Sequence, residues 1–254
     1  MIKLSENFLE KYSRQIIIEK IGLAGQKKIS NSSILVVGCG GLGTSVSQYL
    51  AMSGIGKITL IDDDSVSLSN LNRQTLFMES DIGKKKSLIL SERLRKINPT
   101  AKIEPLDLRI EDKNIIKIFK NFKMIIDCSD NFKTRYLINK VCFREKKILI
   151  SAALQNFDVQ AFAISAWEKS DHPCYECIFP EKLDSEENSC DQMGILAPVA
   201  GLGGIIQAIL TINIILKNNT EIFKELMLFD CFNRKFKIIK TKKNPKCRVC
   251  STKN

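Results

Sequence analysis

Short apolar runs alternate with longer amphipathic segments along the first 155 residues. Apolar runs bounded by turn residues are typical of buried parallel strands, and apolar residues at helical spacing are typical of helices. The runs predict strands at 34–37, 57–61, 102–108, 124–127 and 148–152. The amphipathic segments predict helices at 8–21, 44–53, 84–97, 112–119 and 134–143. This alternation predicts an α/β fold with a Rossmann-like, doubly wound, mostly parallel sheet.

The pattern changes after Asn156. A predicted strand at 159–165 is followed by a polar, cysteine-bearing loop, a long apolar helix, and two strands near 226–230 and 235–239. We expect an antiparallel extension of the same sheet and not a separate domain. The sequence thus predicts a single domain over residues 1–254.

The long apolar helix belongs to a stretch without a single charge, from Gln192 to Leu216, which has the length of a membrane span. Proline and glycine crowd its first half, and polar residues interrupt its second half: Pro198, Gly201, Gly203, Gly204, Gln207, Thr211 and Asn213. This composition favours a buried loop followed by a core helix, so we expect no membrane association.

The net charge of +11 over 254 residues favours acidic partners. The lysines are scattered and no aromatic residues alternate with them, so we expect no nucleic-acid binding. The N-terminus has no apolar core with a cleavage site, and the nine cysteines are an odd number that disulfides cannot pair completely. We therefore expect a cytoplasmic location, where clustered cysteines commonly bind metals.

A glycine-rich turn follows the first predicted strand and opens a helix. Gly38, Gly40 and Gly43 have G-x-G-x-x-G spacing, which lets backbone N–H groups and a helix N-terminus approach a phosphate closely. Asp62 ends the next strand, where a carboxylate can hold ribose hydroxyls. These residues predict a nucleotide site at 8–155, without specifying the chemistry that follows.

Two cations beyond this turn favour a triphosphate over a dinucleotide. Arg73 lies in a polar loop with Asn70, Asn72 and Gln74, and Lys86 opens the next helix. Both would add positive charge where β- and γ-phosphates lie, although a lone Arg or Lys is more often a solvated surface residue.

Asp130 follows the predicted strand at 124–127, at the carboxyl end of the sheet where ligands of open α/β folds bind. Its carboxylate can hold Mg²⁺ against phosphate oxygens. The alternative is helix capping, since Asp130 and Asn131 precede a helix and both residue types favour the N-cap. The two roles are compatible.

Two C-x₂-C pairs, Cys174 with Cys177 and Cys247 with Cys250, predict a structural zinc site. The metal would clip the C-terminal tail onto the crossover loop within residues 156–254. Cys190 is a candidate nucleophile, but the chain has a single histidine, His172, to act beside it. The remaining cysteines are expected to be small core residues: Cys39, Cys128, Cys142 and Cys231.

The scarcity of histidine also bears on mechanism. A C-terminal carboxylate has a pKa of about 3.3–3.7 and attacks as an anion at neutral pH, so it needs no general base. Such a nucleophile needs alignment and cations, which Arg73, Lys86 and Mg²⁺ would supply.

Several motifs together resemble the MoeB/ThiF family of the ubiquitin-activating superfamily. They span nearly the whole chain: Tyr12–Gln15, Gly38–Gly43, Leu68–Gln74, Lys86, Cys128–Asn131, Ser189–Pro198 and the two cysteine pairs. The resemblance implies ATP-dependent adenylylation of the C-terminal Gly-Gly carboxylate of a small β-grasp sulfur-carrier protein, with release of pyrophosphate.

The resemblance also implies roles for individual residues. The implied ATP-binding set is Gly41, Asp62, Ser69, Asn70, Leu71, Asn72, Arg73, Lys86, Asp130 and Asn131. Arg14 would reach the site of the partner subunit in a homodimer. A separate protein would donate the sulfur, since no rhodanese-like segment follows Asn254.

Local sequence favours the molybdopterin-synthase branch over the thiamine branch. The run 66–76, the turn 97–99 and Asn244-Pro245 resemble MoeB, whereas Cys190 matches a cysteine that bonds to the carrier in the thiamine branch. Two other classes stay open: a NAD-dependent oxidoreductase, suggested by the glycine turn and Asp62, and a non-catalytic scaffold.

Overall fold

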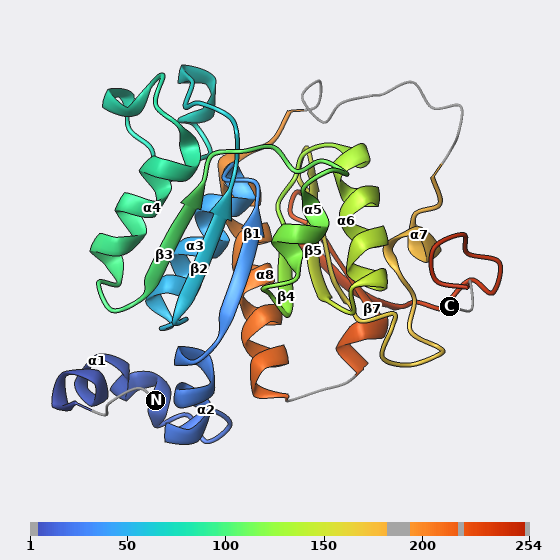
Figure 1. The fold of residues 1–254 in the computed structure, drawn as a ribbon, viewed down its shortest axis with the longest axis horizontal. Helices are drawn as coiled ribbons and strands as arrows, with labels where there is room; N and C mark the ends of the chain where they lie inside the picture. Colours follow the sequence, from blue (N-terminus) through green and yellow to red (C-terminus); the bar gives the residue numbers. More distant parts are fainter. Residues whose placement is uncertain (1–4, 182–193, 218–220, 252–254) are drawn as a thin grey trace.

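One mixed sheet organises the chain, with eight strands in the order β3-β2-β1-β4-β5-β6-β7-β8. The computed structural model describes residues 5–181, 194–217 and 221–251. The strands are β1 (Ser33–Val37), β2 (Lys57–Ile61), β3 (Lys102–Leu106), β4 (Met124–Asp127), β5 (Ile148–Gln155), β6 (Asp158–Ile164), β7 (Glu225–Asp230) and β8 (Lys235–Lys240). β1 to β5 are parallel, and β6, β7 and β8 extend the sheet by antiparallel pairing (Figure 1).

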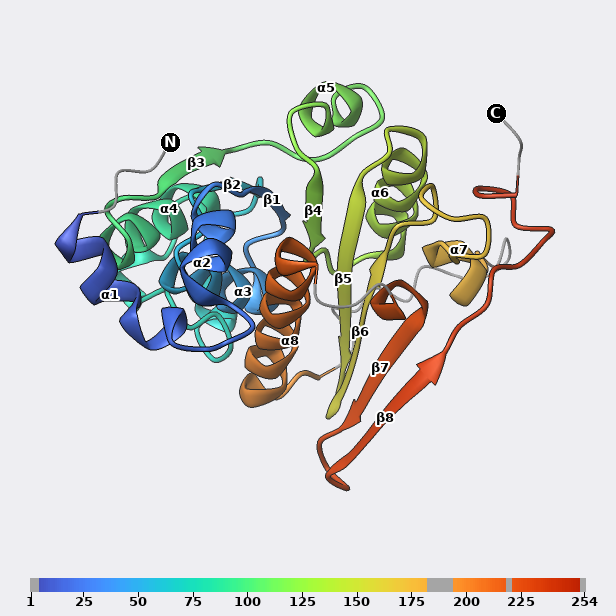
Figure 2. The same ribbon diagram turned by 90° about the horizontal axis from the view of Figure 1, so that it is seen from below.

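Helices cover both faces of the sheet, as a doubly wound fold requires. They are α1 (Glu6–Ile16), α2 (Gly22–Ser30), α3 (Gly41–Met52), α4 (Lys86–Ile97), α5 (Ile115–Phe119), α6 (Phe132–Arg144), α7 (Tyr175–Ile178) and α8 (Ala197–Leu216). α3, α4 and α8 lie on one face, and α5 and α6 on the other (Figure 2).

The central strand β1 contributes side chains to the hydrophobic cores on both faces of the sheet. Ile34 and Val36 enter the core under α3, α4 and α8, whereas Leu35 and Val37 enter the core under α5 and α6. Successive side chains of a strand point to opposite faces, so a strand covered on both sides has to be apolar throughout. This is why β1 is a continuous apolar run in the sequence.

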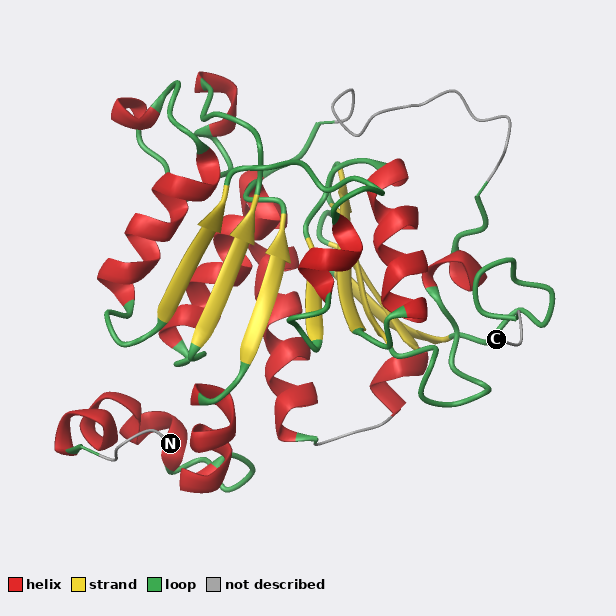
Figure 3. Cartoon of the chain, viewed as in Figure 1, coloured by secondary structure: helices red, strands yellow, loops and turns green. Residues whose placement is uncertain are grey.

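The predicted α/β fold class, mostly parallel sheet and antiparallel extension are confirmed, with shifted element ends (Figure 3). The N-terminal helix differs most. The helix predicted at 8–21 ends at Ile16, and a second helix, α2, begins at Gly22 with a φ of +56°. Periodicity missed α2 because it is fixed by tertiary packing: a Cβ added at Gly25 would lie 2.8 Å from Leu216 Cδ2 on α8.

Within the uncharged stretch, Ala197–Leu216 form a core helix, as predicted. Within the described ranges, α8 is the single helix long and apolar enough to cross a membrane. Its composition has another explanation, because it packs along α3 and against β5 and β6. Gly203 and Gly204 permit that approach, since added Cβ atoms would lie 2.6 Å from Leu42 Cδ2 and from Ser45 Cβ, respectively.

Two glycines of α8 provide a matched test of this packing. Gly204→Ala should destabilise the fold by about 1–3 kcal/mol, the usual cost of overpacking. Gly201→Ala should be neutral or stabilising by up to about 1 kcal/mol, because its added Cβ meets nothing within 4 Å. Urea denaturation of both variants measures the difference, and equal stabilities would contradict the proposed close packing of α3 and α8.

Candidate nucleotide site and cysteine cluster

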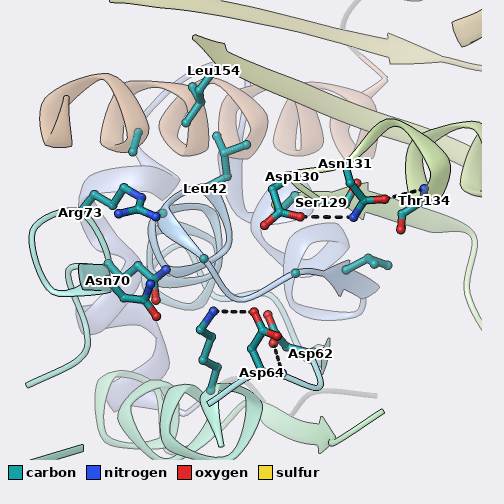
Figure 4. A pocket seen from close by; sticks show the side chains of 18 of the residues that line it. Leu42, Asp62, Asp64, Asn70, Arg73, Ser129, Asp130, Asn131, Thr134 and Leu154 are labelled. Atoms are coloured by element: carbon teal, nitrogen blue, oxygen red, sulfur yellow. Dashed lines mark hydrogen bonds and ion pairs between the residues drawn. The ribbon is translucent and has the colours of Figure 1, made fainter. Parts of the chain in front are cut away.

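A pocket of about 900 Å³ opens at the carboxyl ends of β1, β2 and β4, within the usual size range of ligand sites. The chain crosses from one side of β1 to the other here, so β2 and β4 flank it. Open α/β sheets bind ligands at such a switch point. The pocket brings together most of the predicted nucleotide ligands: Gly38, Gly40, Gly41, Asp62, Ser69, Asn70, Asn72, Arg73, Lys86, Asp130 and Asn131 (Figure 4).

The glycine turn is shaped by close backbone contacts. Gly38 has a φ of +93°, and a Cβ added there would lie 2.6 Å from the Cys128 carbonyl oxygen. A Cβ on Gly43 would lie 2.0 Å from the Gly38 carbonyl oxygen. Gly40 is the N-cap of α3 and carries no side chain to bond the first-turn amides. Those amides therefore stay available to an anion in the pocket.

Asp62 is fixed at the end of β2 by two backbone donors. Cys39 N–H donates to Oδ2 at 2.6 Å, and Asp64 N–H donates to Oδ1 at 2.8 Å. Burial raises the pKa of the Asp62 carboxyl above its usual range, although the Cys39 hydrogen bond and the charge of Lys86 lower it. Each oxygen retains a lone pair that can accept a ligand hydroxyl.

Lys86 brings a buried ammonium to the pocket. Its side chain is 8% exposed, and Nζ donates to Asp64 Oδ2 at 2.8 Å. The pairing is built into the backbone, because Lys86 N–H donates to the Asp64 carbonyl and Ser65 forms a bridge with Lys85. Asp64 compensates a charge that would be costly to bury alone. Its 62% exposed side chain leaves the pair open to exchange with a ligand anion.

Arg73 enters the pocket from the polar loop. Nη1 donates to the Ser69 carbonyl at 2.9 Å and to Asn72 Oδ1 at 3.1 Å. In Figure 4 its guanidinium lies beside Asn70 and on the side of the pocket away from Asp130. The loop thus holds the cation while its other donors remain free for a ligand.

The structure separates the two roles considered for Asp130 and Asn131. Asn131 is the N-cap of α6, and its Oδ1 accepts from Thr134 N–H at 2.9 Å. Asp130 is exposed at the pocket, where Oδ1 accepts from Asn131 Nδ2 at 3.2 Å. An exposed carboxylate with a second free oxygen suits Mg²⁺, which prefers oxygen ligands.

Some predicted residues do not line the pocket. Gly43 packs inside α3, and Leu71 packs against the hydrophobic core. Arg14 is exposed on α1 and does not line the pocket of its own chain. The helix α1 lies near the amino ends of β1, β2 and β3 (Figure 1). Cys190 lies outside the described residues, so its predicted role stays a prediction.

Several polar residues of the pocket were not predicted as ligands, among them Gln74, Arg109 and Arg135. Arg109 comes from the segment after β3, and Arg135 is buried on α6. Gln74 is 3% exposed, and its Oε1 has no hydrogen-bond partner among the described residues. Gln74 had a signal, because it directly follows Arg73 in the polar loop. Arg109 and Arg135 belong to no motif used in the prediction.

The two cysteine pairs meet, although 73 residues separate their partners. Cys174 Sγ lies 3.8 Å from Cys177 Sγ and 3.5 Å from Cys247 Sγ, and Cys177 Sγ lies 3.3 Å from Cys250 Sγ. Sulfurs of a tetrahedral zinc site lie about 3.8 Å apart, whereas a disulfide needs about 2.05 Å. Four clustered thiols with this spacing fit a structural zinc ion.

Three of the four other described cysteines are small core residues, and Cys231 is the exception. Cys39, Cys128 and Cys142 are buried, and burial raises the pKa of each thiol well above its usual range. Cys231 is half-buried beside β7. High pKa values disfavour thiolates, so the three buried residues are unsuited to nucleophilic roles.

Known proteins are similar to this chain in sequence and in fold. Residues 12–249 match the ThiF family model. The chain is 36% identical over 250 residues to "Adenylyltransferase and sulfurtransferase MOCS3" of Caenorhabditis briggsae, covering 97% of this chain and 61% of that protein. It is 33% identical over 245 residues to the "Sulfur carrier protein adenylyltransferase" of Thermus thermophilus, covering 95% and 90%. A crystal structure of E. coli MccB with ATP superposes with a TM-score of 0.77 at 27% identity, covering 96% of this chain and 73% of that one.

Adjacent lysines allow a matched test of the pocket. Lys86→Ala should weaken binding of a non-hydrolysable ATP analogue by about 10- to 100-fold, because it removes a charge-assisted bond. Lys85→Ala removes the same charge, but Lys85 does not line the pocket: its Nζ donates to the Asp63 carbonyl and pairs with Asp107. Isothermal titration should therefore give near wild-type affinity for Lys85→Ala. Equal losses in both variants would contradict the assignment of Lys86.

The cysteine cluster predicts a metal content. Elemental analysis should find about one zinc per purified chain, and Cys247→Ser should lose it together with thermal stability. Cys231→Ser also removes one thiol, but its position lies outside the cluster, so it should retain the metal. A wild-type chain without zinc, or equal loss from both variants, would refute a four-thiolate site.

Proposed function

Because this chain belongs to the ThiF family, we propose that it is an ATP-dependent adenylyltransferase for a small ubiquitin-like sulfur-carrier protein. The reaction activates the C-terminal Gly-Gly carboxylate of the carrier. The names of the two relatives support adenylyl transfer, and that of the Thermus protein supports a sulfur carrier as substrate. The chain spans 61% of the Caenorhabditis relative, so that protein's sulfurtransferase function is not carried over.

The observation that carries the proposal is the convergence of phosphate-binding groups on one pocket. The N-terminus of α3, Arg73 and Lys86 come from three separate segments, and all line it. Asp62 offers a carboxylate to ribose hydroxyls at the end of β2. A dinucleotide needs little cationic charge beyond the glycine turn, whereas a triphosphate benefits from both side chains.

The chemistry requires alignment more than proton transfer. A carboxylate oxygen of the carrier attacks the α-phosphorus of ATP, the bond from that phosphorus to the bridging oxygen breaks, and pyrophosphate leaves. The carboxylate is already ionised at neutral pH, since its pKa is about 3.3–3.7. His172, the single histidine, is 1% exposed and packs against Phe223 away from the pocket. The reaction thus needs no general base, and His172 is not placed to act as one.

Arg73 and Lys86 would stabilise the charge that develops on the leaving pyrophosphate. Asp130 would hold Mg²⁺, which neutralises phosphate oxygens when bound. In the second site, Cys174, Cys177, Cys247 and Cys250 would hold zinc. That metal would be structural, because four thiolates leave no open position for a substrate.

We also propose a homodimer in the cytoplasm that acts with a separate sulfur donor. Arg14 is exposed on α1 and is not among the residues that line the pocket of its own chain. It therefore needs a second subunit to take part in nucleotide binding. The molybdopterin-synthase small subunit is the proposed carrier, on the MoeB-like segments 66–76 and 97–99; the thiamine carrier is the alternative.

Carrier-dependent exchange of labelled pyrophosphate into ATP tests the function. Exchange should require one of the two carriers, and Arg73→Ala should lower it by at least about 100-fold if the guanidinium acts mainly in the transition state. Arg144→Ala, at the far end of α6, removes a 54% exposed arginine and should leave the rate unchanged. No exchange with either carrier would refute the proposal, and tight NADH binding instead would favour the oxidoreductase.

A further inference from the structure

Gln74 is a buried amide in the pocket whose oxygen lacks a partner. The residue lines the pocket and is 3% exposed, and its Oε1 accepts no hydrogen bond from the described residues. Buried polar groups of native proteins nearly always have a partner, so an exception at a ligand site needs an explanation. A role toward the ligand is such an explanation.

The backbone holds Gln74 at the wall of the pocket. Gln74 N–H donates to the Asn70 carbonyl at 3.0 Å, and the Gln74 carbonyl accepts from Phe77 N–H at 3.1 Å. Phe77 is 7% exposed and belongs to the core under α3, α4 and α8. The turn that carries Gln74 is therefore anchored in the core, which places the amide before a ligand binds.

The nitrogen of the same amide lies at the start of α3. A Cβ added at Gly40, the N-cap of that helix, would lie 3.7 Å from Gln74 Nε2. A Cβ added at Gly41 would lie 3.3 Å from the Arg73 carbonyl oxygen, so the segment 73–74 packs against the first turn of α3. No side chain caps the N–H groups of that turn, and Gln74 adds a side-chain donor beside them.

This group of donors suits a phosphate oxygen. Backbone N–H groups at a helix N-terminus attract anions, and the nitrogen of a primary amide has two hydrogens and no acceptor lone pair. Because the amide is neutral, it adds a directed hydrogen bond without adding charge, unlike Arg73 and Lys86. It can therefore fix the position of a phosphate whose charge the two cations neutralise.

The carboxylate of Asp62 indicates which phosphate this is. Cys39 N–H, one residue before Gly40, donates to Asp62 Oδ2 at 2.6 Å, so the ribose-binding carboxylate borders the glycine turn. The phosphate bonded to the ribose is the α-phosphate. It is thus the phosphate nearest to Gly40 when the ribose hydroxyls bind Asp62.

We propose that Gln74 binds the α-phosphate of the nucleotide through Nε2, beside the backbone N–H groups at the start of α3. Gln74 would then hold the phosphorus that the carrier carboxylate attacks, and this part of the inference rests on the proposed function. The phosphate contact itself does not. The last side-chain torsion of glutamine is soft, so a small rotation can direct a hydrogen of Nε2 at a phosphate oxygen.

Gln26 provides a matched control away from the pocket. It is 0% exposed, and its Oε1 also lacks a partner among the described residues, but its Nε2 donates to the Ser53 carbonyl at 3.0 Å. Of the two glutamines, Gln74 alone lines the pocket. Gln26→Met and Gln74→Met make the same change at similar burial, so a difference in nucleotide affinity between them reports the pocket contact.

Binding of adenosine, AMP and a non-hydrolysable ATP analogue tests the contact. Gln74→Met should bind AMP and the ATP analogue about 10-fold more weakly than wild type, the usual effect of losing a hydrogen bond to a charged group. It should bind adenosine with wild-type affinity, because adenosine has no phosphate. Gln26→Met should bind all three with wild-type affinity. Isothermal titration of the wild type and both variants at one Mg²⁺ concentration measures these affinities.

A second variant changes the donor and keeps the shape of the side chain. Gln74→Glu replaces the amide nitrogen with a carboxylate oxygen, whose repulsion from the phosphate should weaken AMP binding more than Gln74→Met does. Its affinity for adenosine should again equal that of the wild type. This variant keeps the inference testable if Gln74→Met does not fold, because AMP and adenosine are compared on one protein.

Three results would overturn the inference: wild-type affinity of Gln74→Met for AMP, a loss that adenosine shares, or a loss confined to the ATP analogue. The second result would indicate a purely structural role, and the third a contact with the β- or γ-phosphate. The expected binding pattern without pyrophosphate exchange by the wild type would refute the proposed function alone. Carrier-dependent exchange by the wild type, together with unchanged AMP affinity in Gln74→Met, would refute the inference alone.

Discussion

The structure depends on one close backbone approach, between the turn after β1 and the turn after β4. A Cβ on Gly38 would lie 2.6 Å from the Cys128 carbonyl oxygen, and a Cβ on Gly43 would lie 2.0 Å from the Gly38 carbonyl oxygen. Neither contact tolerates a side chain. The ladder between β1 and β4 fixes the spacing of their carboxyl ends, and the first contact brings together the two turns that follow them. Gly38 and Cys128 both line the pocket, so a side chain at Gly38 would change the shape of its wall.

Electrostatics within the pocket is balanced before any ligand arrives. Lys86 is buried but paired with the exposed Asp64, and Asp62 accepts two backbone hydrogen bonds that offset part of the cost of its burial. A triphosphate would offer Lys86 a second anionic partner without first requiring a proton to move. The overall charge of +11 raises the local concentration of anionic ligands but does not select among them. Selection comes from the position of each side chain on its own strand end or helix start.

The sequence predicted the features that depend on local patterns, and it missed those that depend on contacts between distant segments. β1, β2 and β4 could be predicted because their apolar runs are continuous, and the cysteine cluster because paired thiols have a fixed spacing. The place of Asp62 and Lys86 followed from the same strands and helices. α2 was missed because it is fixed by contact with α8, and Arg135 because it lies inside α6 and belongs to no motif, although it lines the pocket and bonds the Ser129 carbonyl. Leu71 lies within a correctly identified loop, but its side chain turns to the core, a choice that sequence proximity does not determine.

The antiparallel extension explains how the cysteine cluster and the nucleotide pocket both come to contact α6. β6, β7 and β8 add to the sheet beside β5, and the chain after β8 returns the second cysteine pair to the first, across 73 residues. The first pair packs on α6, whose N-terminus borders the pocket through Asn131 and Thr134. A nucleotide domain needs only the parallel part of this sheet. The four-cysteine cluster therefore packs on α6, on the sheet face opposite α8. Because residues at the start of α6 line the pocket, the cluster supports the shape of a pocket that it does not line.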